Sequence, residues 1–238
     1  GGSQIITETL TITILPVNDR PTANLDAVLP SIDEDVASAA NPGVRFDSLN
    51  FGYSDATDDQ SAAGGGDTAT ANTWIALVGN NTPVNKGNWQ VSDGSGGWIT
   101  IPPDGLEITN ALIFPVDREV RFVPAADYFG NPGTLSVRLA DASRALTAST
   151  SAEDLRDLSL LENGSSIGQT SSWNAVNRLI SIGVNPINDA PELVPPLPAD
   201  PDDGVLTVAE DDNDPAGSTV SSLFGDYFVD ERDSSAFW

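Results

Sequence analysis

The sequence contains no cysteine, no histidine and no methionine. Without cysteine the chain can form neither disulfides nor thiolate metal sites. Without histidine it lacks a common zinc ligand and the side chain that most often transfers protons near neutral pH. No run of about 18 consecutive apolar residues is present either, so we expect no direct membrane insertion. These absences argue against zinc chemistry and against catalysis by histidine.

Basic residues are also scarce. Lys and Arg together number 10 against 35 Asp and Glu, which gives a formal net charge of −25. Such a charge repels phosphate backbones and anionic lipid head groups, so nucleic acid and membrane surfaces are excluded as partners. Hydrophobic residues make up 39% of the chain, enough for a packed core. Acidity could serve solubility alone, but that does not explain why the acids cluster at repeated positions.

A short cassette occurs twice. Residues 16–21 read Pro-Val-Asn-Asp-Arg-Pro, and residues 186–191 read Pro-Ile-Asn-Asp-Ala-Pro. Each copy is followed first by a Glu-Asp pair and later by an Asp-x-x-Asp step. Recurrence at the period of a whole domain indicates a tandem array. We therefore interpret the chain as a section of a longer array that holds one complete domain and the edges of its two neighbours.

The cassettes supply only oxygen ligands, which are the ligands that Ca²⁺ requires in numbers of six to eight. We predict several Ca²⁺ ions at the junctions, where they would stiffen an otherwise flexible array. The predicted ligands of the first junction are Asn18, Asp19, Glu34, Asp35, Asp55 and Asp58. Those of the second are Asn188, Asp189, Glu210, Asp211, Asp230 and Asp233. An Asn-Asp turn before proline would explain one isolated copy, but not two copies with matching acidic partners. Because such sites need abundant calcium, we expect an extracellular protein.

Hydrophobic periodicity places a strand before each cassette. Residues 9–14 and 179–184 both alternate apolar and polar side chains, as half-buried strands do. We therefore assign residues 1–21 to the last strand of a preceding repeat and its linker. Residues 22–191 form a complete module, and residues 192–238 a linker and the start of the following repeat.

Within the module, short alternating segments separated by Gly, Pro and Asn predict an all-β sandwich. We expect strands at residues 74–78, 111–114, 119–123 and 134–139. Residues 89–92 and 98–101 flank the sequence Asp-Gly-Ser-Gly-Gly, whose glycines favour a tight hairpin. One short inserted helix is predicted around Leu155, Leu158 and Leu161, after a capping-box pattern at residues 151–154.

Other residues are weaker candidates. Asp127 and Asp141 follow strands or turns and could be metal ligands, although a loop Asp is more often a turn former. The four tryptophans of the module could be core anchors or could line a recognition pocket. Asp104 and Glu107 could be regarded as a carboxylate pair for glycoside hydrolysis. Nothing distinguishes these two acids from the many others in the chain, so we expect no enzymatic activity. The tryptophans are Trp74, Trp89, Trp98 and Trp173.

The junction motifs resemble those of cadherin-like and bacterial immunoglobulin-like repeats in RTX-type surface adhesins. Residues 88–92 and 97–98, with the stretch 120–139 that contains Arg-Phe-Val-Pro-Ala, resemble more specifically the ligand-binding module of such adhesins. The resemblance implies a calcium-bound β-sandwich on the bacterial cell surface that takes part in cell adhesion and biofilm formation. Some members bind short peptides, including free C-terminal carboxylates, through a calcium-dependent pocket.

Two hypotheses about function follow. The first is an adhesin module that binds a peptide or protein ligand on another cell or surface, with neighbouring repeats of the same chain as its other partners. The second is a purely structural spacer stiffened by Ca²⁺. Residues 22–191 are more than the roughly 100 residues of a simple immunoglobulin-like spacer, which favours the first. The leucine-rich segment around residues 142–174 replaces a glycine-rich loop expected from the resemblance.

Overall fold

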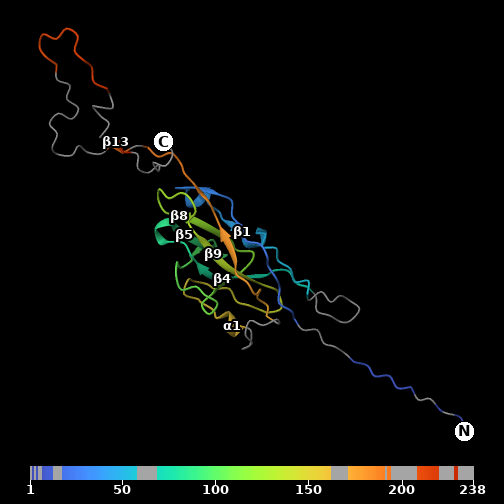
Figure 1. The fold of residues 1–238 in the computed structure, drawn as a ribbon. Helices are drawn as coiled ribbons and strands as arrows, with labels where there is room; N and C mark the ends of the chain where they lie inside the picture. The colour runs from blue at the N-terminus through green and yellow to red at the C-terminus, as the bar shows by residue number, and fades with distance from the viewer. Residues whose placement is uncertain are drawn as a thin grey trace. The chain divides into compact units, whose positions relative to one another are not determined.

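The computed structural model describes residues 2, 4, 7–12, 18–57, 69–161, 171–190, 192–193, 208–219 and 228–229. The chain divides into two compact units, Gly1–Asn185 and Pro186–Trp238. The first unit is built mostly of β-strands in several sheets, with one short α-helix among the described residues (Figure 1). The prediction of an all-β fold is confirmed at this level.

The largest sheet has five strands in the order β1-β10-β9-β4-β7. Its long central strands β9 and β4 are antiparallel, and β1 runs parallel to β10 at the edge. Beyond β10, the chain forms a further parallel pair between β11 and β2. The strands are β1 Ala27–Val28, β2 Ile32–Asp33, β4 Trp74–Asn80, β7 Leu112–Pro115, β9 Thr134–Ala140, β10 Arg178–Ser181 and β11 Val184–Asn185.

The second sheet has four strands in the order β3-β8-β5-β6. They are β3 Val44–Arg45, β5 Gly87–Ser92, β6 Trp98–Thr100 and β8 Glu119–Pro124. The predicted hairpin is confirmed, since β5 and β6 pair with Val91 opposite Ile99. In its turn Gly94 has a φ of +76°, and the Arg118 guanidinium lies where a Cβ would stand. The positive φ favours glycine at this position, and any larger residue would have to displace the Arg118 guanidinium.

One hydrophobic core joins the two sheets. Trp89 and Phe122 of the four-stranded sheet pack edge to face, with ring centroids 5.3 Å apart. They belong to the same buried cluster as Leu77 and Leu139 of the five-stranded sheet. The Trp89 Nε1 donates a hydrogen bond to the Thr82 hydroxyl at 2.9 Å, so its one polar group is satisfied. The predicted alternation of residues 134–139 thus places Leu135, Val137 and Leu139 in this core.

A second, smaller core lies on the other face of the five-stranded sheet. Ala76, Ile113 and Ala140 of that sheet pack there against Leu158 and Trp173, which come from the segment after β9. The described helix α1 comprises Leu158–Leu161, so it begins later than the predicted helix, which included Leu155. Residues 151–154 instead form a turn that precedes a bridge between Arg156 and Ala111. Leu158 and Trp173 therefore cover this face of the sheet.

The described residues of the first unit also form three short 3-10 helices: η1 Ser38–Ala40, η2 Phe46–Ser48 and η3 Val84–Lys86. Of the strand predicted at residues 9–14, the structure describes residues 9–12, which are in no strand, and Leu10 is 84% exposed. No described strand pairs with residues 9–12. In the second unit, β12 Glu192–Leu193 pairs antiparallel with β13 Phe228–Val229.

Candidate functional site

Two acidic side chains are buried together at the end of the first unit where the first cassette lies. Backbone hydrogen bonds in both directions between Thr22 and Ser54 bring the segment after the cassette beside Asp55. Asp141 directly follows β9, and its carboxylate accepts a hydrogen bond from the Asn18 Nδ2 at 3.3 Å. Asp55 is 5% exposed and Asp141 fully buried. Asn18, Asp55 and Asp141 are named here the first acidic site.

The hydrogen bonds at the first acidic site come from neutral donors. The backbone N–H of Thr70 donates to Asp55 Oδ2 at 2.8 Å, and that of Ser143 donates to Asp141 Oδ1 at 2.8 Å. The other Asp55 oxygen, Oδ1, is buried with no hydrogen-bond partner. Within the described part of the chain, no Lys or Arg forms an ion pair with either carboxylate. The two carboxylates thus accept hydrogen bonds from neutral donors and form no ion pair with a described basic residue.

This environment shifts the titration of Asp141. Burial raises the pKa of the Asp141 carboxyl above its ordinary value, because a charged group loses solvation there. The negative charge of Asp55 raises the pKa of Asp141 further, while hydrogen bonds from Ser143 and Asn18 oppose the shift. At neutral pH an ionised Asp141 therefore carries a free-energy cost that a cation would relieve.

The donor set of the first acidic site suits a hard cation. Carboxylate oxygens of Asp55 and Asp141 could bind Ca²⁺ directly, and a half-turn of the Asn18 amide would present its Oδ1 in place of Nδ2. Asp19, the other predicted ligand from the linker, is half-buried next to Asn18. Asp58 lies outside the described residues. Of the predicted ligands, the structure brings Asn18 and Asp55 together.

The structure separates the predicted pair Glu34 and Asp35 from the first acidic site. Asp141 follows the C-terminal end of β9, whereas the backbone of Glu34 bonds to Asn185, beyond the opposite end of that strand. Seven residues of β9 alone span about 20 Å. Glu34 lies far from the first acidic site because β1 runs parallel to β10 and β2 runs parallel to β11. The chain therefore follows the edge of the sheet to its opposite end before it reaches Glu34.

At this opposite end a second group of acids lies together. Asp35 and Asp127 both adopt a φ of +57°, which is rare for residues other than glycine. The Asp127 N–H donates to Asp35 Oδ1 at 3.3 Å, and carboxylate oxygens of the two residues approach within 4.8 Å. Glu34, next to Asp35 in the sequence, is fully buried. These three residues are the second acidic site.

Sequence reasoning ranked Asp127 and Asp141 as weaker candidates, yet each lies in one of the two acidic sites. The signal for Asp141 was present in the sequence, because an aspartate placed directly after a buried strand lies at the end of the sheet. Its nearness to Asp55 depends on the pairing of β4 with β9. The backbone of Thr73, just before β4, bonds to Ala140, and its hydroxyl donates to the carbonyl oxygen of Asp141.

The second cassette repeats the local geometry of the first. In the second unit, the Asn188 Nδ2 donates to the Asp189 carbonyl oxygen at 2.8 Å. In the first unit, the Asn18 Nδ2 donates to the Asp19 carbonyl oxygen at 3.0 Å. The shared hydrogen bond is a structural counterpart of the repeated sequence. Glu210 and Asp211 occupy an exposed turn, and Asp230 and Asp233 lie outside the described residues.

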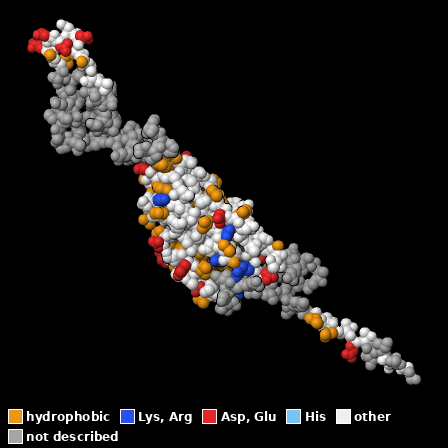
Figure 2. Space-filling model, in the orientation of Figure 1, with side chains coloured by type: hydrophobic (Ala, Val, Ile, Leu, Met, Phe, Trp, Pro, Cys, Tyr) orange, Lys and Arg blue, Asp and Glu red, His pale blue; other side chains and the backbone are white. Residues whose placement is uncertain are grey.

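The tryptophans divide into core and surface positions. Trp89 and Trp173 are fully buried, and Trp74 is half-buried against the second core. Trp98 lies on the outer side of the four-stranded sheet, where the Arg121 guanidinium stacks 3.8 Å above its ring. Asp104 and Glu107 are exposed, and Glu107 accepts hydrogen bonds from Thr109 and Asn110. On the face drawn in Figure 2, hydrophobic side chains are interspersed with polar ones.

Comparison with known proteins gives no relative: no family model matches the sequence, and neither a curated protein nor a solved structure matches it. A search of the described residues for a helix long and apolar enough to cross a membrane also found none.

Proposed function

We propose that the chain contains a calcium-dependent module of an extracellular adhesin on the bacterial cell surface. In this proposal the five-stranded and four-stranded sheets are the two layers of an immunoglobulin-like or cadherin-like sandwich. Ca²⁺ ions bind at its two ends and stiffen the connection to neighbouring repeats. The module binds a peptide or protein ligand on another cell or surface.

The first acidic site is the observation that carries the proposal. Asp55 and Asp141 are buried and form no ion pair with any described Lys or Arg, and buried carboxylates destabilise a fold unless a positive charge compensates them. One Ca²⁺ shared by Asp55 and Asp141 would neutralise both charges and would engage the unpartnered Asp55 Oδ1. Because Asn18 of the linker reaches the same group, the ion would also fix the linker to the module.

Two further observations support calcium over a merely acidic surface. The same Asn-to-Asp hydrogen bond forms in both cassettes, as expected if both linkers present the same ligands. Asp35 and Asp127, at the other end of the module, hold their carboxylates close together through backbone of positive φ. Strained backbone of this kind is common at ligand sites.

The experiment for recognition is an array of diverse peptides, with free and amidated C-termini, probed with the chain in Ca²⁺ and again in chelator. The adhesin proposal expects hits that require Ca²⁺. If no peptide of the array binds the chain in Ca²⁺, but Ca²⁺ raises the melting temperature strongly, the spacer function is favoured instead.

A further inference from the structure

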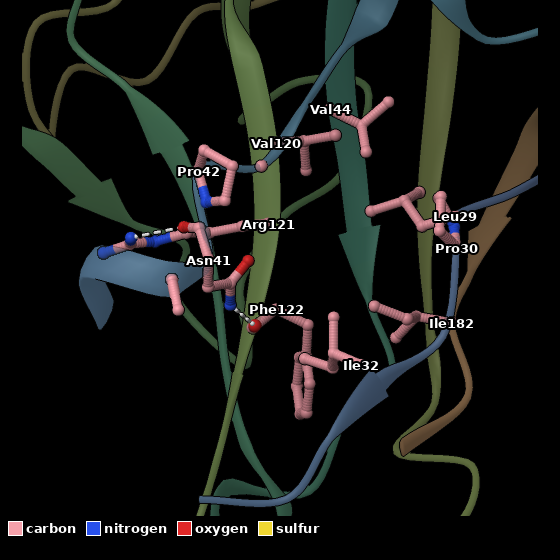
Figure 3. A pocket seen from close by; sticks show the side chains of 12 residues that line it. Leu29, Pro30, Ile32, Asn41, Pro42, Val44, Val120, Arg121, Phe122 and Ile182 are labelled. Atoms are coloured by element: carbon pink, nitrogen blue, oxygen red, sulfur yellow. Dashed lines mark hydrogen bonds between the residues drawn. The ribbon is translucent and has the colours of Figure 1, made fainter. Parts of the chain in front are cut away.

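An apolar pocket of about 220 Å³ opens between the edges of the two sheets. Leu29, Val120, Phe122 and Ile182 form its floor, and each is at most 3% exposed. Towards the surface the walls become half-buried at Ile32 and Val44 and exposed at Pro30, Ala40 and Pro42. In Figure 3 the aliphatic side chains of the two sheet edges converge on the space between them. The hollow therefore leads from the surface into the main core.

The outer wall of the pocket is held in place by polar side chains. Arg121 Nη1 donates to the carbonyl oxygens of Ser38 and Asn41, at 3.1 and 2.8 Å. The Asn41 Nδ2 donates to the Phe122 carbonyl oxygen at 2.7 Å. The guanidinium points away from the converging aliphatic side chains (Figure 3). These bonds hold residues 38–43 as a rim and keep the polar groups engaged with one another.

The inside of the pocket is lined mainly by apolar side chains, so it offers water few hydrogen-bond partners. Water gains few hydrogen bonds against such an apolar lining, so its replacement by an apolar group is favourable. The volume is below the 300–1,000 Å³ usual for small-molecule sites, so the hollow suits one large aliphatic or aromatic side chain. The prolines at its mouth lack backbone N–H donors, which disfavours the addition of a partner strand there.

The charges beside the lining residues indicate which partner can deliver such a side chain. Asp33 follows Ile32, and Glu119 precedes Val120, whereas Arg45, next to Val44, is paired with Asp47. Arg121 keeps its positive charge, because its rim partners are neutral carbonyl oxygens, but its guanidinium points away from the hollow (Figure 3), and the chain as a whole has a net charge of −25. An acidic segment is therefore repelled and a basic one attracted.

We propose that this pocket is a recognition site for a peptide segment that inserts one large apolar side chain flanked by basic residues. The inference rests on the proposed adhesin function only for its biological setting. The pocket and its lining lie in the first unit, and none of the lining residues belongs to either acidic site.

The test is a titration of the methyl-labelled chain, in Ca²⁺, with capped peptides of the form Gly-Lys-X-Lys-Gly, followed by NMR. With X as Leu or Phe, the methyl signals of Leu29, Ile32, Val44, Val120 and Ile182 should shift together. With X as Ala, affinity should be at least about tenfold lower, since most of the buried apolar surface is lost. Replacing the flanking Lys by Glu should also weaken binding, and added salt should weaken the Lys form.

Two matched variants localise the effect. Val44→Phe fills the pocket mouth and should abolish the methyl shifts, whereas Val28→Phe, at a position 71% exposed on β1, should preserve them. If Val44→Phe does not fold, Ala40→Phe provides the same block at an exposed rim position. Equal binding of the Leu and Ala peptides, or shifts that survive both blocking variants, would overturn the proposal.

The two proposals can fail separately. The methyl shifts of the pocket could meet these criteria while the melting temperature does not change with Ca²⁺. That result would support the pocket proposal and reject the calcium-dependent function. Calcium-dependent array hits with unmoved pocket methyls would uphold the adhesin function and reject the pocket.

Discussion

Burial raises the pKa of Asp141, and the negative charge of Asp55, 86 positions earlier in the sequence, adds a smaller contribution in the same direction. Burial is the larger cause of this shift, and no described Lys or Arg is paired with either carboxylate. Burial therefore makes an ionised Asp141 unfavourable in the absence of a cation, and repulsion by the Asp55 charge adds to this cost. A bound Ca²⁺ would convert this repulsion into attraction, which makes the site a sensitive point for mutation.

Asp141→Asn should remove most of the stabilisation by Ca²⁺. In Ca²⁺ the variant should melt several degrees below the wild type, because a ligand charge is lost. In chelator the difference in stability between the wild type and Asp141→Asn should depend on pH. A raised folded-state pKa means that the contribution of Asp141 is full below about pH 4 and is lost as the pH rises through the folded-state pKa.

Thermal melts from pH 3.5 to 8, with and without Ca²⁺, would check this. The stability of the wild type relative to Asp141→Asn should fall with rising pH in chelator. Asp104→Asn, at an exposed position, is the control and should match the wild type throughout. Identical calcium responses of Asp141→Asn and wild type would contradict the assignment of this site.

Arg121→Ala should destabilise the first unit by about 2–3 kcal/mol. The carbonyl oxygens of Ser38 and Asn41 would lose their donor, and Trp98 would lose the guanidinium stacked on it. Arg121→Lys keeps the charge but cannot reproduce the forked hydrogen bonds, so an intermediate loss is expected. Urea denaturation in Ca²⁺ measures both; an unchanged free energy of unfolding for Arg121→Ala would show that the rim does not depend on this side chain.

Leu158 and Leu160 provide a matched pair for the second core. Leu158 is fully buried in the cluster with Trp173, whereas Leu160 is 71% exposed on the same short helix α1. Leu158→Ala should cost about 2–5 kcal/mol of unfolding free energy, and Leu160→Ala about 0.5 kcal/mol or less. Similar losses for both variants in chemical denaturation would mean that the segment after β9 does not pack on the sheet as described.

Asp93 makes the hairpin between β5 and β6 sensitive to acid. Hydrogen bonds from the backbone N–H groups of Ser95 and Gly97 lower the pKa of Asp93 below its ordinary value. A lowered folded-state pKa stabilises the fold above the unfolded-state pKa, near 4, and this gain disappears as the pH falls through the folded-state value. The wild type should therefore exceed Asp93→Asn in melting temperature at pH 6, and the difference should close towards pH 2. A constant difference across this range would argue against the ionised acceptor.

Much of the fold could be predicted because local signals agreed with tertiary structure. The hairpin carries its turn chemistry in Asp93 and Gly94, and the alternation of residues 134–139 matches the buried face of β9. The predicted helix began too early in the sequence. Leu155, Leu158 and Leu161 have helical spacing, but residues 151–154 form a separate turn and α1 begins only at Leu158. Leucines that cover a sheet satisfy the same pattern with only one turn of helix.

The grouping of the acids could be predicted only in part. Asn18 and Asp55 were expected to meet, but Glu34 and Asp35 lie with Asp127 at the other end, since the edge strands run parallel to β10 and β11. Such long-range pairing leaves no mark in the local sequence. The apolar pocket was missed for the same reason, as its walls come from segments near residues 30, 42, 121 and 182.

The most direct test of the account is calorimetric titration of the chelator-treated chain with Ca²⁺, in parallel with the Asp55→Asn and Asp141→Asn variants. We predict tight uptake of Ca²⁺ by the wild type and the loss of at least one site in each variant, with no change in Asp104→Asn. A wild-type chain that takes up no Ca²⁺ at millimolar concentration, or variants that bind as many ions as the wild type, would contradict it.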